Sequence, residues 1–309
     1  MTEITIIIPT YNSERFLCNA INSLLDQTLT DFEIIVVDDG STDDTAAVIK
    51  RYLFDCQIRY VYQSNRGPSA ARNHGIALSS SKYVAFVDAD DALAPEALSM
   101  LFAALEHDQS AQWCTTDVVW VTGEDVTAQT RQIIPARLPG NLYYGILCDN
   151  DTEGPGGNIG RPFFFRRDAL VAVGMFDEQM KAREDWELPI RMIHNDMLPK
   201  YVKGGLYLHH VGTGGLTRNR RLILDNSDRV MQKHHKILAD KGDGAAARIY
   251  AKNLWDLGRQ YLYEQRDVWR ALSCAIRSLK YDFDLSRLFH PIYNRLSGGR
   301  GFTMSRPTD

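Results

Sequence analysis

Short runs of β-branched and other apolar residues alternate with amphipathic stretches through the first hundred residues of the chain. The apolar runs occupy residues 4–8, 32–37, 58–62 and 84–87. Each has the length and continuous apolar character of a strand that is buried on both faces. The amphipathic stretches predict helices over residues 14–27, 43–53 and 69–78, the last rich in small residues that allow close packing. Strands alternating with helices predict βαβ units and a mostly parallel central sheet, an α/β fold.

The pattern continues less regularly between residues 95 and 218. A helix is expected from about Pro95, and the later predicted elements are strands at 112–122, 163–167 and 201–208 and helices at 168–173 and 183–195. Pro189 suits the last helix if it falls in the first turn. Residues 123–151 show weak periodicity and several turn residues, which predicts an irregular segment or a mobile loop.

From Asn219 the chain becomes a series of amphipathic helices, separated at 242–244, at Asp267 and at 282–284. Their apolar stripes contain Leu254, Trp255, Leu257, Tyr261, Trp269, Leu272, Ile276 and Leu279. The simplest interpretation is that these helices pack on each other and on the preceding domain. The alternative follows from an excess of Lys and Arg over Asp and Glu, which favours a basic amphipathic surface resting on anionic lipid. The sequence thus predicts domains at 1–218 and 219–309, with a disordered tail from Ser297.

Polar side chains follow the first four predicted strands. In order along the chain they are Thr10 and Tyr11, Asp38 and Asp39, Arg66 and Arg72, and Asp88, Asp90 and Asp91. Ligands of open α/β sheets bind outside the carboxyl ends of the strands, so we expect these groups to meet at one edge. An aromatic ring, an acid that accepts from a base N–H, an arginine and a carboxylate cluster together suit a nucleoside diphosphate.

The three aspartates after the fourth strand have two interpretations. Carboxylates cannot be buried unpaired without a large cost, and they are suitable ligands for a hard divalent cation that also binds phosphate oxygens. The alternative is an acidic turn in which an aspartate caps the helix that begins near Pro95.

Several protein classes are excluded or disfavoured. The glycines of residues 154–160 do not have the G-x-G-x-x-G spacing of a dinucleotide site, and no P-loop motif occurs. A net charge of −4 argues against a nucleic-acid partner. Five scattered cysteines without a CxxC pair predict reduced thiols and a cytoplasmic location. The sequence also has no apolar run of membrane-spanning length and no signal-peptide pattern. The variant of this prediction is a cytoplasmic protein in peripheral contact with the inner face of a membrane.

Four ordered motifs resemble the successive signatures of family 2 glycosyltransferases. They are Ile6-Ile-Ile-Pro-Thr-Tyr-Asn12, Val36-Val-Asp-Asp-Gly-Ser-Thr-Asp43, Asn65-Arg-Gly-Pro-Ser-Ala-Ala-Arg-Asn73 and Phe86-Val-Asp-Ala-Asp-Asp91. The resemblance extends through Thr217. It implies the GT-A fold and transfer of a sugar, with inversion, from a nucleotide-diphosphate donor.

The resemblance also implies roles for individual residues. The donor site would consist of Pro9, Thr10, Tyr11 and Asp39 around the nucleoside base, Arg72 near the base or diphosphate, and Asp88, Ala89 and Asp90 at the ribose and the metal-bound diphosphate. The cofactor would be Mg²⁺ or Mn²⁺. A Gly-rich loop after His210 would close over the bound donor.

A second group of motifs carries the acceptor chemistry. The spacing Arg-Arg…Val-Gly-x-Phe-Asp-Glu…Glu-Asp-Trp-Glu-Leu resembles the same family, in which the aspartate of the Glu-Asp pair is the general base. That residue is Asp185, with Glu184 as the alternative base or an acceptor-orienting group. Without the resemblance, the simpler interpretation of Asp185 is a helix cap or an acid stabilised by the helix dipole. The family register makes His210 a metal ligand, with His209 as its neighbour, although Leu208 stands where the family usually has Arg.

We therefore predict an inverting, metal-dependent glycosyltransferase with a UDP-sugar donor and a saccharide or lipid-linked acceptor. Two alternatives come from other classes. A sugar nucleotidyltransferase shares the α/β layout and the metal aspartates but needs no base such as Asp185. A binding module without catalysis would be expected to lack the aspartates, and all of them are present.

Overall fold

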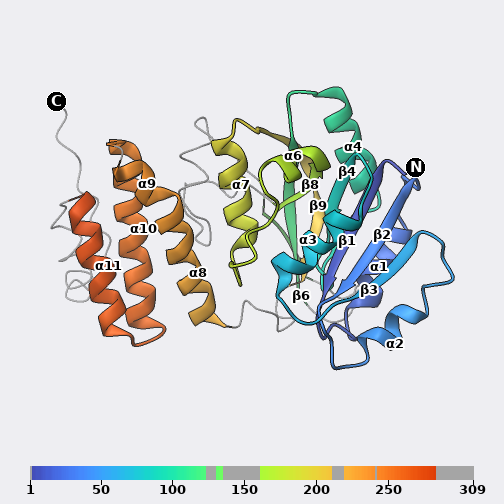
Figure 1. Cartoon of the computed structure of the whole chain (residues 1–309), viewed down its shortest axis with the longest axis horizontal. Coiled ribbons are helices and arrows are strands. Elements are labelled where there is room, and N and C mark those ends of the chain that lie inside the picture. Colours follow the sequence, from blue (N-terminus) through green and yellow to red (C-terminus); the bar gives the residue numbers. More distant parts are fainter. Residues whose placement is uncertain (1, 123–129, 135–160, 211–218, 241, 283–309) are drawn as a thin grey trace. The chain divides into compact units, whose positions relative to one another are not determined.

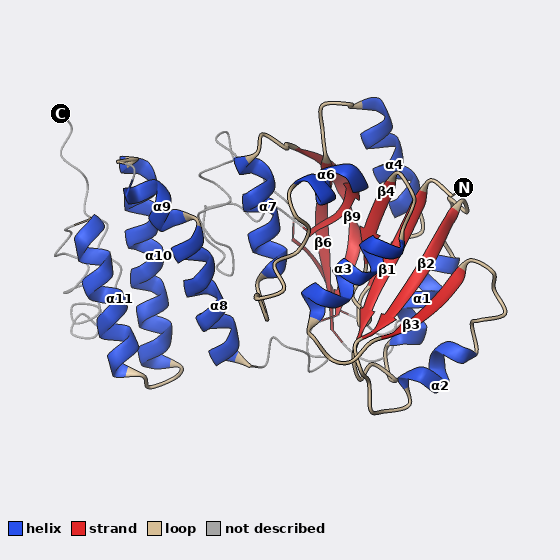
Figure 2. Cartoon of the chain, in the orientation of Figure 1, coloured by secondary structure: helices blue, strands red, loops and turns tan. Residues whose placement is uncertain are grey.

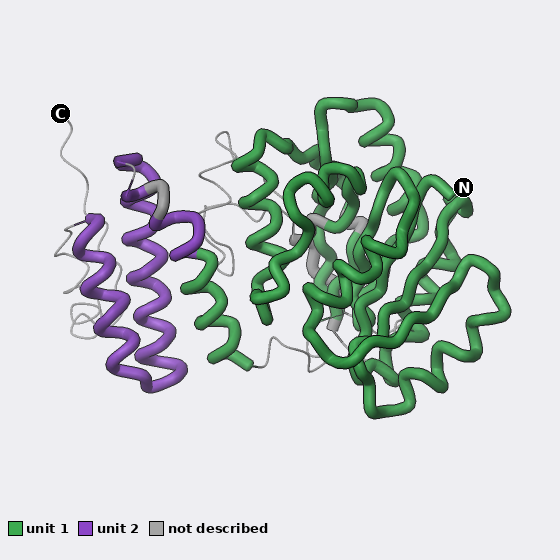
Figure 3. The backbone as a smooth tube through the Cα atoms, viewed as in Figure 1, with its two compact units in different colours: residues 1–230 green, residues 231–309 purple. Residues whose placement is uncertain are grey.

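The computed structural model describes residues 2–122, 130–134, 161–210, 219–240 and 242–282. Contacts within the chain define two compact units, Met1–Val230 and Met231–Asp309 (Figure 3). The boundary lies twelve residues beyond the predicted 218/219 division. Helix α8 (Arg220–Lys233) explains the difference, because Asn226 and Ser227 accept hydrogen bonds from Lys181 N–H and Arg183 Nε at 3.1 Å each. Most of α8 is thus attached to the first unit.

The first unit is built on one sheet with helices on both faces (Figures 1 and 2). Its strands run in the spatial order β3-β2-β1-β4-β8-β6-β9-β5, with β7 paired to β6. The described strands are β1 (Ile4–Thr10), β2 (Phe32–Asp38), β3 (Ile58–Tyr62), β4 (Tyr83–Phe86), β5 (Ala92–Leu93), β6 (Trp113–Thr122), β7 (Thr130–Ile134), β8 (Arg161–Arg166) and β9 (Pro199–His210). The described helices of this unit are α1 (Leu17–Leu25), α2 (Thr45–Lys50), α3 (Pro68–Leu78), α4 (Ala97–His107), α6 (Arg167–Ala172), α7 (Glu184–His194) and α8.

The direction of the strands determines which residues lie at the carboxyl-end edge of the sheet. Strands β1, β2, β3 and β4 are mutually parallel, as the sequence predicts. Strand β8 runs antiparallel to both β4 and β6, so β6 has the direction of β4, and β9 is parallel to β6. The carboxyl ends of β1, β2, β4, β6 and β9 therefore lie at one edge of the sheet.

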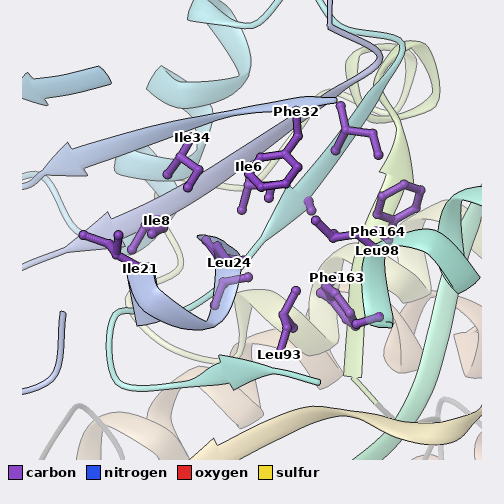
Figure 4. Packing of buried hydrophobic residues seen from close by; sticks show 14 of the residues in the cluster. Ile6, Ile8, Ile21, Leu24, Phe32, Ile34, Leu93, Leu98, Phe163 and Phe164 are labelled. Atoms are coloured by element: carbon purple, nitrogen blue, oxygen red, sulfur yellow. The ribbon is translucent and has the colours of Figure 1, made fainter. Parts of the chain in front are cut away.

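The core explains why the first strands are uninterrupted apolar runs. Ile6 and Ile8 of β1 and Ile34 of β2 pack against Ile21 and Leu24 of α1 on one face (Figure 4). On the other face, Ile7 packs under α3. All of these residues are fully buried, so both faces of the strands are covered.

Helix α3 approaches the sheet as closely as its small residues predict. A Cβ on Gly75 would lie only 2.6 Å from Ile7 Cγ2, so a side chain there would overlap the sheet. The glycine therefore sets the distance between α3 and β1. This distance in turn places Arg72, one turn earlier on α3, beside the carboxyl end of β4.

Two features differ from the prediction. Residues 130–134, within the predicted irregular segment, form β7, because they pair in register with Val118–Thr122 of β6. Pro189 lies in the second turn of α7 and not in the first. Its missing N–H removes the i→i+4 hydrogen bond to the Asp185 carbonyl. The rest of the predicted irregular segment, the Gly-rich loop after His210 and the tail from Ser297 lie outside the described residues.

The second unit contains α9 (His235–Asp240), α10 (Gly244–Tyr263) and α11 (Val268–Tyr281). Two of the three predicted breaks contain helix N-caps. Asp243 accepts from Ala245 and Ala246 N–H at 3.0 Å, and Asp267 accepts from Arg270 N–H at 3.0 Å. In the described parts of the chain, no helix combines the length and the apolar character needed to cross a membrane.

We predict that Gly75→Ala destabilises the first unit by roughly 1–3 kcal/mol, because the new methyl group overlaps Ile7. Urea denaturation of the two single variants and of the Ile7→Ala/Gly75→Ala double variant measures the coupling. The double variant should lose less stability than the two single variants added together, since Ile7→Ala removes the overlapping atoms. Strictly additive losses would contradict the overlap.

Candidate active site

The end of β1 presents polar groups that are suited to a ligand. Thr10 is 2% exposed, and its hydroxyl is buried without a hydrogen-bond partner among the described residues. The next residue, Tyr11, is 50% exposed. Asn12 adopts a left-handed φ of 49° and accepts a hydrogen bond from Thr42 N–H at 2.8 Å, which joins this loop to the one after β2. A buried polar group without a partner is costly, so Thr10 marks a place where a ligand can complete the structure.

Asp39, after β2, has a structural role that the sequence did not reveal. Its carboxylate accepts hydrogen bonds from Gln63 Nε2 at 2.7 Å, from Arg66 N–H at 2.9 Å and from Gly67 N–H at 2.7 Å. These bonds hold the loop that leads into α3, where Gly67 has a φ of 97°. A carboxylate has about four acceptor positions, so one remains for a donor group on a ligand.

Arg72 of α3 lies between two carboxylates from distant parts of the chain. Nη2 is 2.7 Å from Asp88 Oδ1, at the end of β4, and Nη1 is 2.6 Å from Glu184 Oε1, in the first turn of α7. The guanidinium also lies over the Phe176 ring, 5.4 Å from its centroid. Burial alone would lower the pKa of Arg72, but the charges of Asp88 and Glu184 raise it, so the cation is permanent.

This arrangement refines two of the predicted roles. Arg72 reaches the edge of the sheet as expected, but its guanidinium contacts protein carboxylates on both sides. The Glu184 carboxylate is buried and points to Arg72. Glu184 is therefore well placed to orient the site, and its neighbour Asp185 has the more open position.

Asp91 forms a separate contact with β9. Its carboxylate lies 3.0 Å from His209 Nδ1 and accepts the His210 N–H at 3.0 Å. Helix α4 begins after Glu96, whose side chain makes no cap hydrogen bond, and the first turn is capped by Gln27, which accepts from Leu98 N–H at 3.0 Å. Asp88 and Asp91 therefore do not cap the helix near Pro95, because Asp88 pairs with Arg72 and Asp91 with the end of β9.

The turn that contains Asp90 precedes β5, which pairs with the end of β9. Ala92 pairs with Leu208 and Leu93 with Tyr207 in the antiparallel β5–β9 ladder, and Asp91, next to Asp90, accepts the His210 N–H. His210 Nδ1 is buried and has no hydrogen-bond partner in the described part of the chain. Among the described residues, no group of three or more His, Cys, Asp or Glu side chains is arranged around a common metal position.

Asp185 lies at the start of α7, one residue after Glu184. Arg183 precedes the helix with a left-handed φ of 64°, and this sharp turn brings the acidic first turn of α7 to the sheet edge. Asp185 lines a small pocket together with Arg72, Asp88 and several apolar side chains, Phe86, Phe163, Phe165, Phe176, Leu188 and Pro189. The predicted donor-side aspartate and the predicted base thus share one cavity.

Two positioning interactions were missed from the sequence. Asn73 donates to Phe176 O and accepts from Phe176 N–H, each at 2.9 Å, which fixes the segment leading to α7. Arg191 binds the fully buried Glu187 and also donates to the carbonyls of Val173 and Met175, at 2.7 and 2.6 Å. The only sequence signal for these contacts was that the residues fall within or beside the family motifs.

We predict that Arg72→Met costs at least about 3 kcal/mol of unfolding free energy, because two carboxylates at a buried site lose their shared cation. The matched control is Arg66→Met, which removes an exposed ion pair with Glu178 and should cost at most about 1 kcal/mol. Urea denaturation compares the two. Equal losses of unfolding free energy would show that the buried Arg72 contacts stabilise the protein no more than the exposed Arg66–Glu178 pair.

Comparison with known proteins identifies the family. The family model described as Glycosyl transferase family 2 matches residues 5–174. An uncharacterized glycosyltransferase of Escherichia coli K12, YibD, is 32% identical over 259 residues, which cover 77% of this chain and 73% of YibD. Uncharacterized glycosyltransferases of Rickettsia bellii and Rickettsia felis match 34% and 35% of this chain, but the match spans only 15% and 18% of their own lengths.

Solved structures share the fold. Residues 1–349 of Staphylococcus aureus TarS in complex with UDP-GlcNAc align with a TM-score of 0.61 and 20% identity, over 96% of this chain and 88% of that one. The mannosyltransferase PcManGT of Pyrobaculum calidifontis, in complex with GDP-Man and Mn²⁺, aligns with a TM-score of 0.59 and 17% identity, over 96% and 80%. The predicted GT-A-like α/β fold is thus confirmed. With the family model matching more than half of its length, the chain belongs to glycosyl transferase family 2.

Proposed function

We propose that this chain is an inverting glycosyltransferase that moves a hexosyl or N-acetylhexosaminyl group from a UDP-sugar to a hydroxyl of a saccharide or lipid-linked acceptor. The observation that carries the proposal is that Asp185 and Asp88 line one pocket. A single displacement would use one carboxylate on the side of the donor and a second carboxylate on the side of the acceptor. Family membership supports transfer of a sugar and not the nucleotidyl transfer considered from the sequence.

The donor would lie along the carboxyl ends of β1, β2 and β4. Thr10 offers an unpartnered hydroxyl, Tyr11 offers an exposed ring, and Asp39 keeps one acceptor position for a base N–H. Pro9 and Ala89 would also line this site, as the resemblance to the family implies. UDP is proposed as the nucleotide because the TarS structure with the same fold contains UDP-GlcNAc.

The residues at the edge fit a divalent cation that the donor helps to hold. Asp90 is next to Asp91, which accepts the His210 N–H, and His210 Nδ1, without a partner among the described residues, is a suitable ligand atom. Asp88, which already binds Arg72, would contribute its second oxygen or the ribose contact. Diphosphate oxygens would supply the remaining ligands, which agrees with the absence of a three-residue cluster in the described part. When bound, Mg²⁺ or Mn²⁺ would neutralise the departing diphosphate, and the PcManGT complex contains Mn²⁺.

Asp185 would act on the acceptor. Its carboxylate accepts the proton of the attacking hydroxyl as the new bond to the anomeric carbon forms, and the diphosphate leaves on the opposite side. Glu184 and Arg72 hold the first turn of α7 against β4, so the base keeps a fixed position relative to Asp88. One displacement from the opposite side inverts the anomeric configuration.

We predict that Asp185→Asn separates binding from chemistry. The amide keeps the size of the side chain but cannot accept the proton, so transfer should fall by roughly 10²–10⁴-fold. Calorimetry should give a UDP-sugar Kd within a few-fold of the unchanged protein. Asp168→Asn, in the first turn of α6 and exposed, is the matched control for loss of a helix-terminal charge and should leave both quantities unchanged. Loss of donor binding by Asp185→Asn, or full turnover, would contradict the role as base, and an NMR coupling that shows retention would contradict the single displacement.

We further predict that Asp90→Ala and His210→Gln weaken UDP binding in the presence of Mn²⁺ by at least about tenfold, and have little effect in EDTA. Titration calorimetry in both buffers measures the difference. Asp31→Ala is the control, because Asp31 immediately precedes β2 at the opposite edge of the sheet. If both variants bind UDP normally in Mn²⁺, the cation is held by other groups.

A further inference from the structure

Helix α11 has two apolar sides, of which one is buried and the other is exposed. Cys274 and Ser278, four residues apart, are buried, and the Ser278 hydroxyl donates to Ala251 O of α10 at 2.7 Å. Trp269, Leu272 and Ile276, spaced three and four residues apart, share the other side and are 81%, 49% and 60% exposed. Packing between helices, the simplest interpretation of the stripe from the sequence, accounts for only one side of α11, so the alternative of a lipid-facing surface remains for the other side.

The exposed side extends to the start of the helix. Val268, at the first position of α11 and four residues before Leu272, is 59% exposed. Scattered single apolar residues are normal on a surface, but a line of them along a helix is typical of an interaction site. We call Trp269, Leu272 and Ile276 the α11 stripe.

The charge of the second unit indicates the chemistry of the partner. Residues 231–309 contain fourteen Lys and Arg against eight Asp and Glu, a net charge of +6 in a chain whose overall charge is −4. Helix α11 itself contains Arg270, Arg277 and Lys280 and no acidic residue. Lys280 follows Ile276 by four residues, so this exposed cation continues the line of the stripe. The partner should therefore be anionic and also accept apolar side chains.

We propose that the α11 stripe binds peripherally to an anionic lipid surface. An amphipathic helix of this kind lies in the plane of the interface, with its apolar side chains below the headgroups and its cations beside them. Tryptophan is favoured at this depth because its ring is amphipathic. A second copy of this chain is a poorer occupant, because two such helices would bring like charges together. The proposal concerns a surface of the second unit and is independent of the transfer chemistry.

The test is binding of the full chain to sedimenting vesicles of phosphatidylcholine, with and without about 30% phosphatidylglycerol. Binding should require the anionic lipid and should weaken when salt rises from about 0.05 to 0.5 M, because screening shortens the range of the charges. Leu272→Ser/Ile276→Ser should lower the partition coefficient by at least about tenfold. Both side chains are exposed, so the thermal unfolding curve should stay the same.

Two controls make the result specific. Phe54→Ser removes a 94% exposed aromatic residue from the first unit and should change vesicle binding less than twofold. Acyl chains brominated near the interface should quench the fluorescence of the bound chain, and Trp269→Phe should remove most of this quenching while binding persists.

Three results would overturn the proposal. The first is failure of the unchanged protein to bind anionic vesicles at low salt. The second is binding of the Leu272→Ser/Ile276→Ser variant as strong as that of the unchanged protein. The third is a dimer, seen by sedimentation velocity, that the same substitutions dissociate. The last result would assign the stripe to a second copy. UDP-sugar affinity, measured on the same samples, should be equal in all variants, so failure here is distinguishable from failure of the proposed function.

Discussion

One buried cation connects the parts of the candidate active site. Arg72 comes from α3, Asp88 from the end of β4 and Glu184 from the start of α7. In the sequence, Glu184 is 112 residues from Arg72. A buried guanidinium is tolerated only when its charge is matched, and removal of Arg72 would leave two carboxylates without their shared cation. The close packing of α3 on β1 at Gly75 and the sharp turn at Arg183 both place these groups within contact. The position of α7 relative to the carboxyl end of β4 therefore depends on the contacts among Arg72, Asp88 and Glu184.

The sequence predicted the first half of the fold well for a simple reason. The first four strands of the sheet are covered on both faces, so their apolar character shows in uninterrupted runs, and the helices between them have their own periodicity. Strand β7 was missed because Thr-Arg-Gln-Ile-Ile lacks a continuous apolar run, and its pairing with β6 decides its structure. The division of α8 between the two units was also unpredictable, since it depends on hydrogen bonds to residues 181 and 183.

The motifs nominate candidate site residues but do not predict the contacts of these residues. The motifs identified Asp39, Asp88 and Asp185, while the partners of these groups come from loops and helices far along the chain. Asp39 binds two backbone N–H groups that any residue could supply, so no residue type signals this contact. The pairing of Asp91 with His209 follows from the β5–β9 register, which a two-residue strand does not reveal in sequence. Pairing between residues far apart in the chain leaves no local pattern in the sequence, so the contacts of these candidate residues could not be predicted.

The charge distribution gives a physical reason for the proposed cation. Residues 1–230 contain twenty-one Lys and Arg against thirty-one Asp and Glu, a net charge of −10, yet the proposed donor carries a diphosphate. Arg72 adds little attraction for it, because Asp88 and Glu184 already match its charge. An anionic ligand at an acidic edge needs local positive charge that does not come from this guanidinium. A divalent cation shared by Asp90, His210 and the diphosphate would supply that charge only while the donor is bound, so the same acidic edge that would repel the free diphosphate becomes its binding site.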